Sequence, residues 1–414
     1  MQASDVTLLD RFLNRHVRRG VLRIVHADGS AVSVGAPDPA FTDVTIRFTD
    51  AAAERAILRN PGLGAAELFM AGRLLIEAGD IRALIHLLKG NRTWEAGRVK
   101  LGSGPLAALG SAVGRRLDRI NTAARAKRNV AHHYDLSDRL YDLFLDADRQ
   151  YSCAYFTDPA NDLDQAQADK KAHIAAKLAL RPGQRVLDIG CGWGGMALYL
   201  NRVADVDVLG ITLSEEQLKV ARTRAAAAGV ADRVRFELID YRAVDGPFDR
   251  IVSVGMFEHV GPRDYRTFLA KCRDLLTPDG VMLLHTIGRL GGPGVTDDFT
   301  AKYIFPGGYN PALSEIVRAN EGLKFLLTDV EVLRLHYAYT LDAWYDRTVA
   351  AKEAIVALYD ERFYRMWTFY LAGAGAAFRF GGLVNYQLQF ARDRHTLPIT
   401  RDYMVAGERA LTGA

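Results

Sequence analysis

Short apolar runs alternate with longer amphipathic segments in the middle of the chain. The apolar runs have the length of β-strands and cover 185–189, 207–211, 234–238, 250–254 and 281–284. The segments between them have helical spacing. One such segment starts at Ser214 and has Gln217 three residues later, which is the pattern of a capping box. Strands that alternate with helices predict an α/β fold with a parallel, doubly wound sheet.

The first 90 residues follow a different pattern. An amphipathic helix is predicted at 6–17 and strands at 21–25 and 44–48, and further helices at 51–60 and 81–89. This mixture predicts a small N-terminal α+β domain. It loosely resembles lipid-carrier domains of the sterol-carrier type, and a packing domain without a ligand fits the pattern equally well.

Three segments complete the pattern and give the expected domain boundaries. Glycine, proline and aromatic residues dominate 288–330, which is typical of a long functional loop such as a lid. Long helices are expected at 340–378 and a last strand at 382–392. We expect an N-terminal lipid- or membrane-associated domain at 1–95, a linker at 96–130 and a catalytic domain at 131–414.

A glycine turn follows the first strand of the sheet, in the sequence VLDIGCGWGG at 186–195. Glycine lets the backbone approach a ligand closely, and the next helix presents free N–H groups there. A dinucleotide site would place an acid at the end of the second strand, where Thr212 stands instead. Because an acid, Asp188, lies inside the first strand, the turn favours S-adenosylmethionine over NAD.

Polar residues and glycine mark the carboxyl ends of the predicted strands, where ligands bind in open α/β sheets. We expect them to form one site, and they are Gly190, Thr212, Asp240, Glu258 and His285. From the residues alone, both Glu258 and His285 are candidates for a general base.

Composition narrows the class of protein. The chain has 414 residues, 49% of them hydrophobic, and a net charge of +4, which excludes nucleic-acid binding driven by overall charge. Its three cysteines have no framework spacing and indicate a reducing, cytoplasmic environment. No apolar run has transmembrane length.

His132 and His133 have no spaced partners, so no metal site is expected. A basic cluster at 115–128 favours either a solvated helix face or contact with anionic lipid.

Nine motifs in one order make the chain resemble the cyclopropane-fatty-acyl-phospholipid synthases, a family that includes the mycolic acid cyclopropane synthases. The motifs are HYDLSDRLYDLFLD, YSCAYF, VLDIGCGWGG, GITLSEEQ, DYR, FDRIVSVGMFEHVGP, LLHTIG, KYIFPGG and YTLDAWYDR. The resemblance implies a mostly parallel, seven-stranded, Rossmann-like methyltransferase sheet. It also implies transfer of a methylene group from S-adenosylmethionine to the cis double bond of a phospholipid acyl chain.

The family's site residues can be carried over to matching positions. The resemblance implies a bound bicarbonate as base, held by Cys153, Glu258, His285, Tyr337 and the backbone of Ile287. It implies that S-adenosylmethionine contacts Tyr151, Ser152, Asp188, Gly190, Gly192, Gly194, Thr212, Gln217, Asp240 and Tyr241. Aromatic rings near a carbocation can stabilise it. The candidates, for each of which ordinary packing is the more frequent role, are Tyr155, Phe156, Phe257, Tyr303, Phe305 and Tyr309. Ala374 stands where many members have a cysteine, so a thiolate there is not required.

Three further expectations come from the resemblance. The substrate is membrane phospholipid, met by peripheral association at the inner face of the membrane, and the protein is a homodimer that binds no nucleic acid. Two alternatives stay open. One is a fatty-acyl methyltransferase that gives methyl-branched or methylene products, and the other is a lipid-binding protein without activity.

Overall fold

The computed structural model describes residues 7–97 and 137–412, which form two compact units. The described part of the N-terminal unit comprises 7–97, 297–304 and 341–382, and that of the large unit comprises 137–296, 305–340 and 383–412. The units therefore interleave along the chain, whereas the boundaries expected from the sequence are consecutive. The basic cluster, the histidine pair at 132–133 and most of the expected linker lie outside the described residues.

A four-stranded sheet forms the base of the N-terminal unit. Its order is β2-β1-β3-β4, with β1 and β3 parallel and the other pairs antiparallel. The strands are β1 (Gly20–Val25), β2 (Ala31–Ala36), β3 (Val44–Phe48) and β4 (Leu74–Ala78). The sequence pattern predicted β1 and β3 but not β2, whose residues are mostly exposed and therefore lack a clear apolar alternation.

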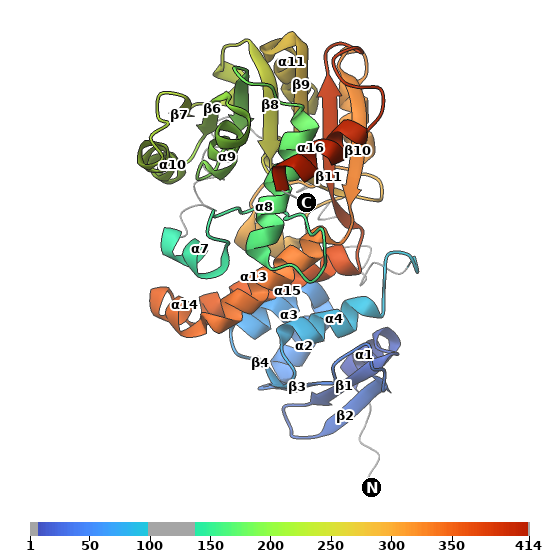
Figure 1. Ribbon diagram of the computed structural model, residues 1–414. Helices are drawn as coiled ribbons and strands as arrows, with labels where there is room; N and C mark the ends of the chain where they lie inside the picture. Colours follow the sequence, from blue (N-terminus) through green and yellow to red (C-terminus); the bar gives the residue numbers. More distant parts are fainter. Residues whose placement is uncertain (1–6, 98–136, 413–414) are drawn as a thin grey trace. The chain divides into compact units, whose positions relative to one another are not determined.

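Helices cover the rest of the N-terminal unit (Figure 1). Those before the large unit are α1 (Leu8–His16), α2 (Ala51–Arg59), α3 (Pro61–Met70) and α4 (Ile81–Gly90). The later ones are η3 (Thr300–Ile304), most of α13 (His336–Ala350), α14 (Lys352–Leu358) and α15 (Glu361–Arg379). Helix α15 packs on α3 and α4, so a late segment completes the unit that the first residues begin.

Seven strands form the sheet of the large unit, in the order β10-β11-β9-β8-β5-β6-β7. Only β11 runs opposite to the other strands of this sheet, which confirms the expected mostly parallel, seven-stranded sheet. The strands are β5 (Arg185–Ile189), β6 (Asp207–Thr212), β7 (Val234–Leu238), β8 (Phe248–Val254), β9 (Leu276–Arg289), β10 (Leu326–Leu333) and β11 (Leu383–Ala391).

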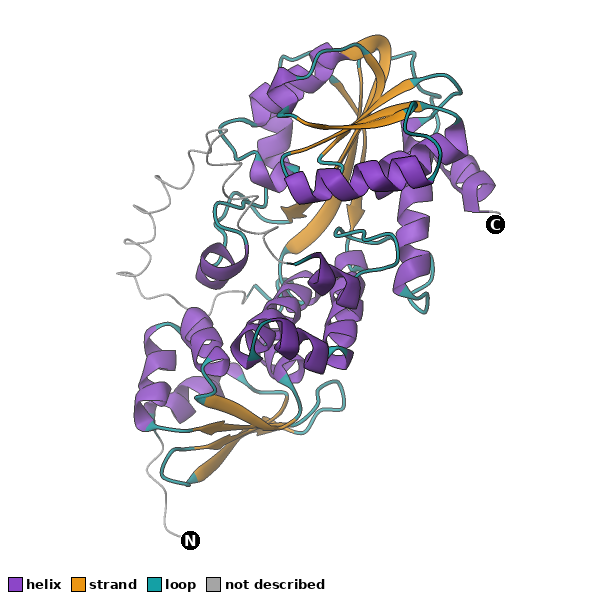
Figure 2. Ribbon diagram, turned by 90° about the vertical axis from the view of Figure 1, so that its left-hand side faces the viewer, coloured by secondary structure: helices purple, strands orange, loops and turns teal. Residues whose placement is uncertain are grey.

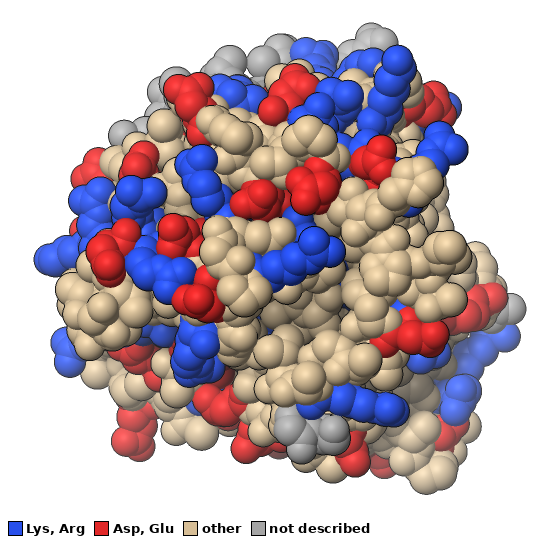
Figure 3. Space-filling view, turned by 45° about the horizontal axis from the view of Figure 1, so that its top comes forward, with Lys and Arg blue, Asp and Glu red and all other residues tan. Residues whose placement is uncertain are grey.

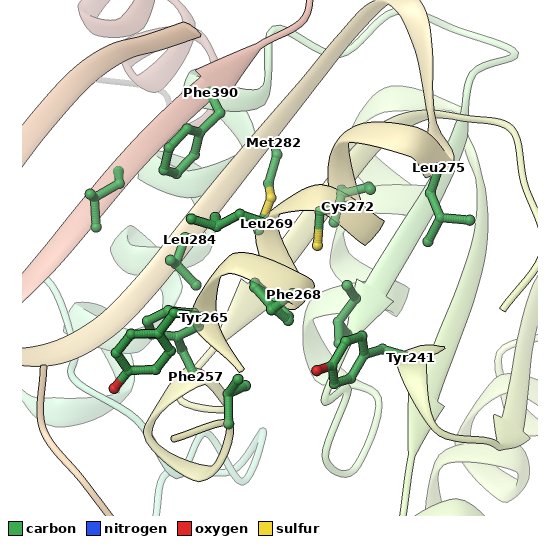
Figure 4. Close-up of a cluster of buried hydrophobic side chains, with 14 of the residues drawn as sticks. Tyr241, Phe257, Tyr265, Phe268, Leu269, Cys272, Leu275, Met282, Leu284 and Phe390 are labelled. Carbon is green, nitrogen blue, oxygen red and sulfur yellow. The ribbon is translucent and has the colours of Figure 1, made fainter. Parts of the chain in front are cut away.

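Helices cover both faces of this sheet, as Figure 2 shows. They are α7 (Asp138–Phe144), α8 (Leu163–Leu178), α9 (Gly195–Ala204), α10 (Glu215–Ala227), α11 (Tyr265–Leu275), α12 (Leu313–Asn320) and α16 (Asp402–Thr412), with short turns η1 (Tyr241–Ala243) and η2 (Phe257–His259). Successive strand residues point to opposite faces. Met282 and Leu284 join the cluster under α11 (Figure 4). Leu283 joins the cluster under α8 and α9.

Two sequence predictions in this unit are corrected by the structure. Strand β9 continues to Arg289, so His285 lies within its strand rather than at its end. The register pairs His285 with Val254, the last residue of β8, and this still places it at the edge where the site was expected. The segment 288–330 is not one long loop, because it contains η3, α12 and the start of β10.

The charged side chains of the surface and the length and polarity of the helices are relevant to membrane association. On the face drawn in Figure 3, basic and acidic side chains are interspersed rather than gathered by sign. Within residues 7–97 and 137–412, every helix is too short or too polar to cross a bilayer.

Candidate active site

A cavity opens at the carboxyl ends of β5, β6, β7 and β8. It is lined by nine of the ten residues expected to contact the cofactor, namely Tyr151, Ser152, Asp188, Gly190, Gly192, Thr212, Gln217, Asp240 and Tyr241. The tenth, Gly194, is the N-cap of α9 and has a left-handed conformation (φ 83°). A Cβ there would lie 2.7 Å from Phe236, so Gly194 permits close packing behind the cavity.

The glycine turn shapes one wall of this cavity. Gly190 and Gly192 both have positive φ, at 83° and 54°, which a residue with a side chain adopts only with strain. A Cβ on Gly190 would lie 2.8 Å from Met256, whereas one on Gly192 would have no atom within 4 Å among the described residues other than its chain neighbours. The space in front of Gly192 is therefore open to a ligand that approaches the backbone.

The hydrogen bonds of Gln217 differ from those of the capping box that its spacing predicted. The Ser214 hydroxyl accepts a hydrogen bond from the Gln217 backbone N–H at 3.3 Å, which is half of the motif. The Gln217 side chain does not return to Ser214, because its carbonyl accepts from the Thr212 hydroxyl at 3.1 Å. Both side chains thus face the cavity at the end of β6.

Asp188 and Asp240, two of the acids that line the cavity, have different hydrogen-bond partners. Burial raises the pKa of Asp188 to about 7, and its Oδ2 has no hydrogen-bond partner among the described residues. Asp240 is paired with Arg242, whose Nε lies 2.8 Å from its Oδ1. Asp188 is therefore the acid that is poised to gain a partner when a polar ligand enters.

Lys170 is a residue of this site that the sequence did not reveal. It lies on α8, is fully buried, and donates to the Gln150 side chain at 2.7 Å and to the Ser152 hydroxyl at 2.8 Å. Gln167, also on α8, donates to the backbone carbonyls of Gln150 and Ser152. Burial lowers the pKa of Lys170 to about 8, which leaves the side chain mostly protonated at neutral pH. Its hydrogen bonds fix the segment that carries Ser152.

Glu258 lies in η2, immediately before the cavity-lining His259. Its Oε1 accepts the backbone N–H of Ile287 at 2.6 Å, while its Oε2 is buried without a partner among the described residues. Burial raises the pKa of Glu258 to about 6. The backbone N–H of Ile287 therefore orients Glu258.

His285 stands on β9 one residue before Thr286, and its backbone carbonyl accepts from Gly255, which lines the cavity. Burial lowers its pKa well below the usual range, and the charge of Lys170 adds to this effect. The ring is therefore neutral, and its Nε2 is buried without a partner in the part of the chain that the structure describes. Gln387 of β11 contacts the other ring nitrogen, a neighbour that the sequence did not reveal.

Cys153 and Tyr337 are both buried. The Cys153 thiol donates to the Ala154 carbonyl at 3.3 Å, and burial raises its pKa, so it is a thiol and not a thiolate. Tyr337 belongs to the first turn of α13. That turn is fixed to the same segment, because Thr340 accepts from the Ala154 amide at 3.0 Å.

Several of the candidate aromatic rings have packing roles. Phe257 stacks on Tyr265 with ring centroids 4.2 Å apart, inside the hydrophobic core that Figure 4 shows. Tyr303 belongs to the N-terminal unit, where its hydroxyl donates to Glu67. Phe305 lies near the cavity-lining His259, at 6.1 Å between ring centroids, and so remains a candidate.

The site shows no arrangement for a metal ion. No cluster of three or more histidine, cysteine or acidic side chains with that potential occurs within 7–97 and 137–412. The chemistry available here rests on a glycine-lined cavity, a buried carboxyl, a neutral imidazole and a buried ammonium.

Several known proteins are similar to this chain in sequence and in fold. The family model for mycolic acid cyclopropane synthetase matches residues 121–388. The cyclopropane-fatty-acyl-phospholipid synthase of Escherichia coli strain K12 is 44% identical over 279 residues, covering 67% of this chain and 72% of that protein. Tuberculostearic acid methyltransferase UfaA1 of Mycobacterium tuberculosis is 35% identical over 408 residues, covering 95% and 93%.

A solved structure extends the similarity to three dimensions. Mycolic acid cyclopropane synthase CmaA1, complexed with SAH and CTAB, has 37% sequence identity and a TM-score of 0.61, covering 64% of this chain and 98% of that one.

Proposed function

Since this chain belongs to the mycolic acid cyclopropane synthetase family and is an S-adenosylmethionine-dependent methyltransferase of that family, we propose that it adds a methylene group to the cis double bond of phospholipid acyl chains. The observation that carries the proposal is the position of Glu258 and His285. Each has a buried polar atom without a partner among the described residues, and each adjoins residues that line the glycine-walled cavity.

The cavity suits S-adenosylmethionine, whose demethylated form is bound in the similar CmaA1 structure. When bound, the cofactor supplies an electrophilic methyl group on a sulfonium centre. The open space at Gly192 admits a ligand against the backbone, and the free Oδ2 of Asp188 offers an acceptor. Tyr151, Ser152, Gly190, Gly194, Thr212, Gln217, Asp240 and Tyr241 complete the contacts that we assign.

An alkene is a weak nucleophile, so the protein must hold the double bond close to the methyl carbon. Attack leaves a positive charge on a chain carbon, and loss of a proton from the added methyl group closes the ring. Water would trap the cation, so the site must exclude it. The burial of Cys153, Glu258 and His285 supports a dry reaction site.

We assign the final proton acceptor to a bicarbonate ion held by Cys153, Glu258, His285, Tyr337 and Ile287. The unpartnered Oε2 of Glu258 can accept the ion's hydroxyl proton, and the unpartnered Nε2 of His285 can donate to its oxygen. Ile287 takes part through Glu258, which its amide orients. Glu258 itself is the rival base, because burial raises its pKa to about 6.

A second function is favoured by one relative. Tuberculostearic acid methyltransferase UfaA1 is similar over 95% of this chain, including the N-terminal unit. In this alternative the same cation does not close a ring. Loss of a proton from a neighbouring chain carbon gives a methyl-branched alkene, whereas a 1,2-hydride shift followed by loss of a proton from the added methyl group gives a methylene branch.

Product analysis separates the two functions. Purified protein is incubated with S-adenosylmethionine, bicarbonate and vesicles of unsaturated phosphatidylglycerol, and the fatty acids are analysed by mass spectrometry. A cyclopropane synthase adds the mass of one CH₂ and yields a product that resists derivatisation of double bonds. A product of the same mass that still reacts as an alkene supports the methyltransferase, and no product with well-folded protein refutes both.

We also propose that the protein works as a homodimer at the inner face of the membrane, with residues 1–95 next to the lipid. Flotation with anionic vesicles and light scattering test these two points. Protein that stays monomeric and does not float would contradict them without affecting the reaction.

A further inference from the structure

Gln387 lies directly beside His285 on the neighbouring strand. The register of β9 and β11 pairs the two residues, and the Gln387 side-chain nitrogen is 3.2 Å from Nδ1 of His285. Both side chains are at least 99% buried. Because water does not reach this contact, the two side chains alone decide which hydrogen-bonding role each atom takes.

A neutral imidazole carries one proton, and the hydrogen bond at one nitrogen decides where that proton resides. His285 is kept neutral by burial and by nearby cations, chiefly Lys170. A side-chain amide nitrogen can only donate. With Gln387 as donor, Nδ1 must accept, and the ring proton must therefore be on Nε2.

We propose that Gln387 is a positioning residue that holds His285 as the Nε2–H tautomer, so that its buried Nε2 donates a hydrogen bond to the anion of the active site. This inference rests on the proposed function for the identity of that anion. The inference also assigns a role to His285, because an Nε2 that already carries a proton cannot accept one. His285 is then a donor and not the general base, which the sequence alone left open.

The tautomer can be measured without any activity. The protein is labelled with ¹⁵N-histidine, and two-bond ¹H–¹⁵N spectra distinguish the two neutral tautomers; His285→Gln identifies the signal among the ten histidines. We expect wild-type His285 to be protonated on Nε2. Protonation on Nδ1 would mean that the Gln387 amide is reversed, with its oxygen accepting, and would overturn the inference whatever the reaction.

Variants connect the tautomer to the reaction. Gln387→Glu replaces the donor by an acceptor and should move the proton to Nδ1, raising the KM for bicarbonate at least tenfold with unchanged affinity for S-adenosylmethionine. The Met side chain in Gln387→Met does not favour either tautomer of His285, so this variant should give an intermediate KM for bicarbonate. An unchanged KM in a Gln387→Glu protein whose tautomer has moved would overturn the role in anion binding.

Gln389 provides the matched control. It is a buried amide two residues along the same strand and donates to the Lys177 carbonyl and to Tyr403, not to His285. Gln389→Met should lose stability while the tautomer and the KM for bicarbonate stay as in the wild type. If wild-type His285 carries its proton on Nε2 but turnover needs no bicarbonate, the assigned anion fails and the tautomer assignment stands.

Discussion

Glu258 combines an oriented oxygen and a free oxygen in one buried carboxyl group, which makes it the most informative residue to change. Glu258→Gln keeps the shape and can still accept from Ile287, but it loses the charge. We expect turnover to fall about 100-fold or more, the typical scale for acid–base residues. The affinity for S-adenosylmethionine should remain, and calorimetry checks it. Turnover close to that of the wild type would show that the carboxylate has no role in the reaction.

Asp188 should make cofactor binding dependent on pH. Burial raises its pKa to about 7, so part of the free protein carries the neutral acid at neutral pH. A cationic ligand favours the carboxylate and lowers this pKa, and binding therefore releases protons. We expect affinity to weaken about tenfold per pH unit below the pKa.

Titration calorimetry in buffers of different ionisation heat measures that release directly. Asp188→Asn should bind with an affinity that does not change over the same pH range. Asp249, at the opposite end of the strands, accepts from the Arg185 amide, and Asp249→Asn should keep the wild-type pH dependence. Equal pH profiles for wild type and Asp188→Asn would show that another group titrates.

The site residues that could be grouped from the pattern of strands and helices share one property, which is their position at the end of a strand. Parallel strands bring their carboxyl ends to one edge, so Gly190, Thr212 and Asp240 could be grouped from the sequence pattern alone. Lys170 and Gln387 could not be found in this way. Lys170 lies on a helix without an apolar stripe, and Gln387 matters only through the register of two antiparallel strands.

At the scale of elements, the central buried strands were easier to predict than the half-exposed ones. Edge strand β7 has only two buried residues but still alternates apolar and polar positions. The strands β5, β6 and β8 read as apolar runs because helices cover both of their faces. Strand β10 is the outermost strand of the sheet and has few buried residues, so no such run marks it. Helix α16 was missed for the same reason, since Met404 is its one buried residue.

The C-terminal helix α16 is fixed by ion pairs that depend on pH. His173 of α8 contacts Glu408 of α16 at 2.9 Å and Glu331 of β10 at 2.7 Å. Burial opposes the protonation of His173, but the two carboxylates outweigh it and raise the pKa above its usual value. The stabilisation is thus complete below pH 6.5 and is lost as the pH rises through the raised pKa.

We expect His173→Gln to lower the free energy of unfolding by about 2 kcal/mol in acid, with a smaller loss in alkaline solution. Part of the loss should persist at every pH, because Tyr155 stacks on the ring at 4.0 Å. Denaturant titrations give the energies, and hydrogen exchange should show faster exchange in 402–412. His395 is exposed, and His395→Gln should match the wild type. A loss independent of pH would contradict the ionic part of the argument.

At the scale of the whole molecule, the chain leaves the N-terminal unit and returns to it twice. The sequence predicted consecutive domains because composition changes near residue 95 and nothing in 341–382 distinguishes its helices from the rest of the catalytic segment. Which helices pack together depends on contacts between residues that are far apart in sequence. In this unit, the ring centroids of Phe369 of α15 and Phe69 are 6.3 Å apart, and those of Phe380 and His86 are 5.3 Å apart.

This interleaving predicts that the segment after residue 97 does not fold normally alone. Removal of α3 and α4 would uncover the face of α15 that packs on them, at about 2 kcal/mol for each large apolar side chain. We expect a chain without residues 1–97 to aggregate, as size-exclusion chromatography and thermal denaturation would show. Supplying 1–97 as a separate coexpressed fragment should restore solubility. A monomeric truncated chain with the wild-type melting temperature would show that the 341–382 helices need no partner from the first 97 residues.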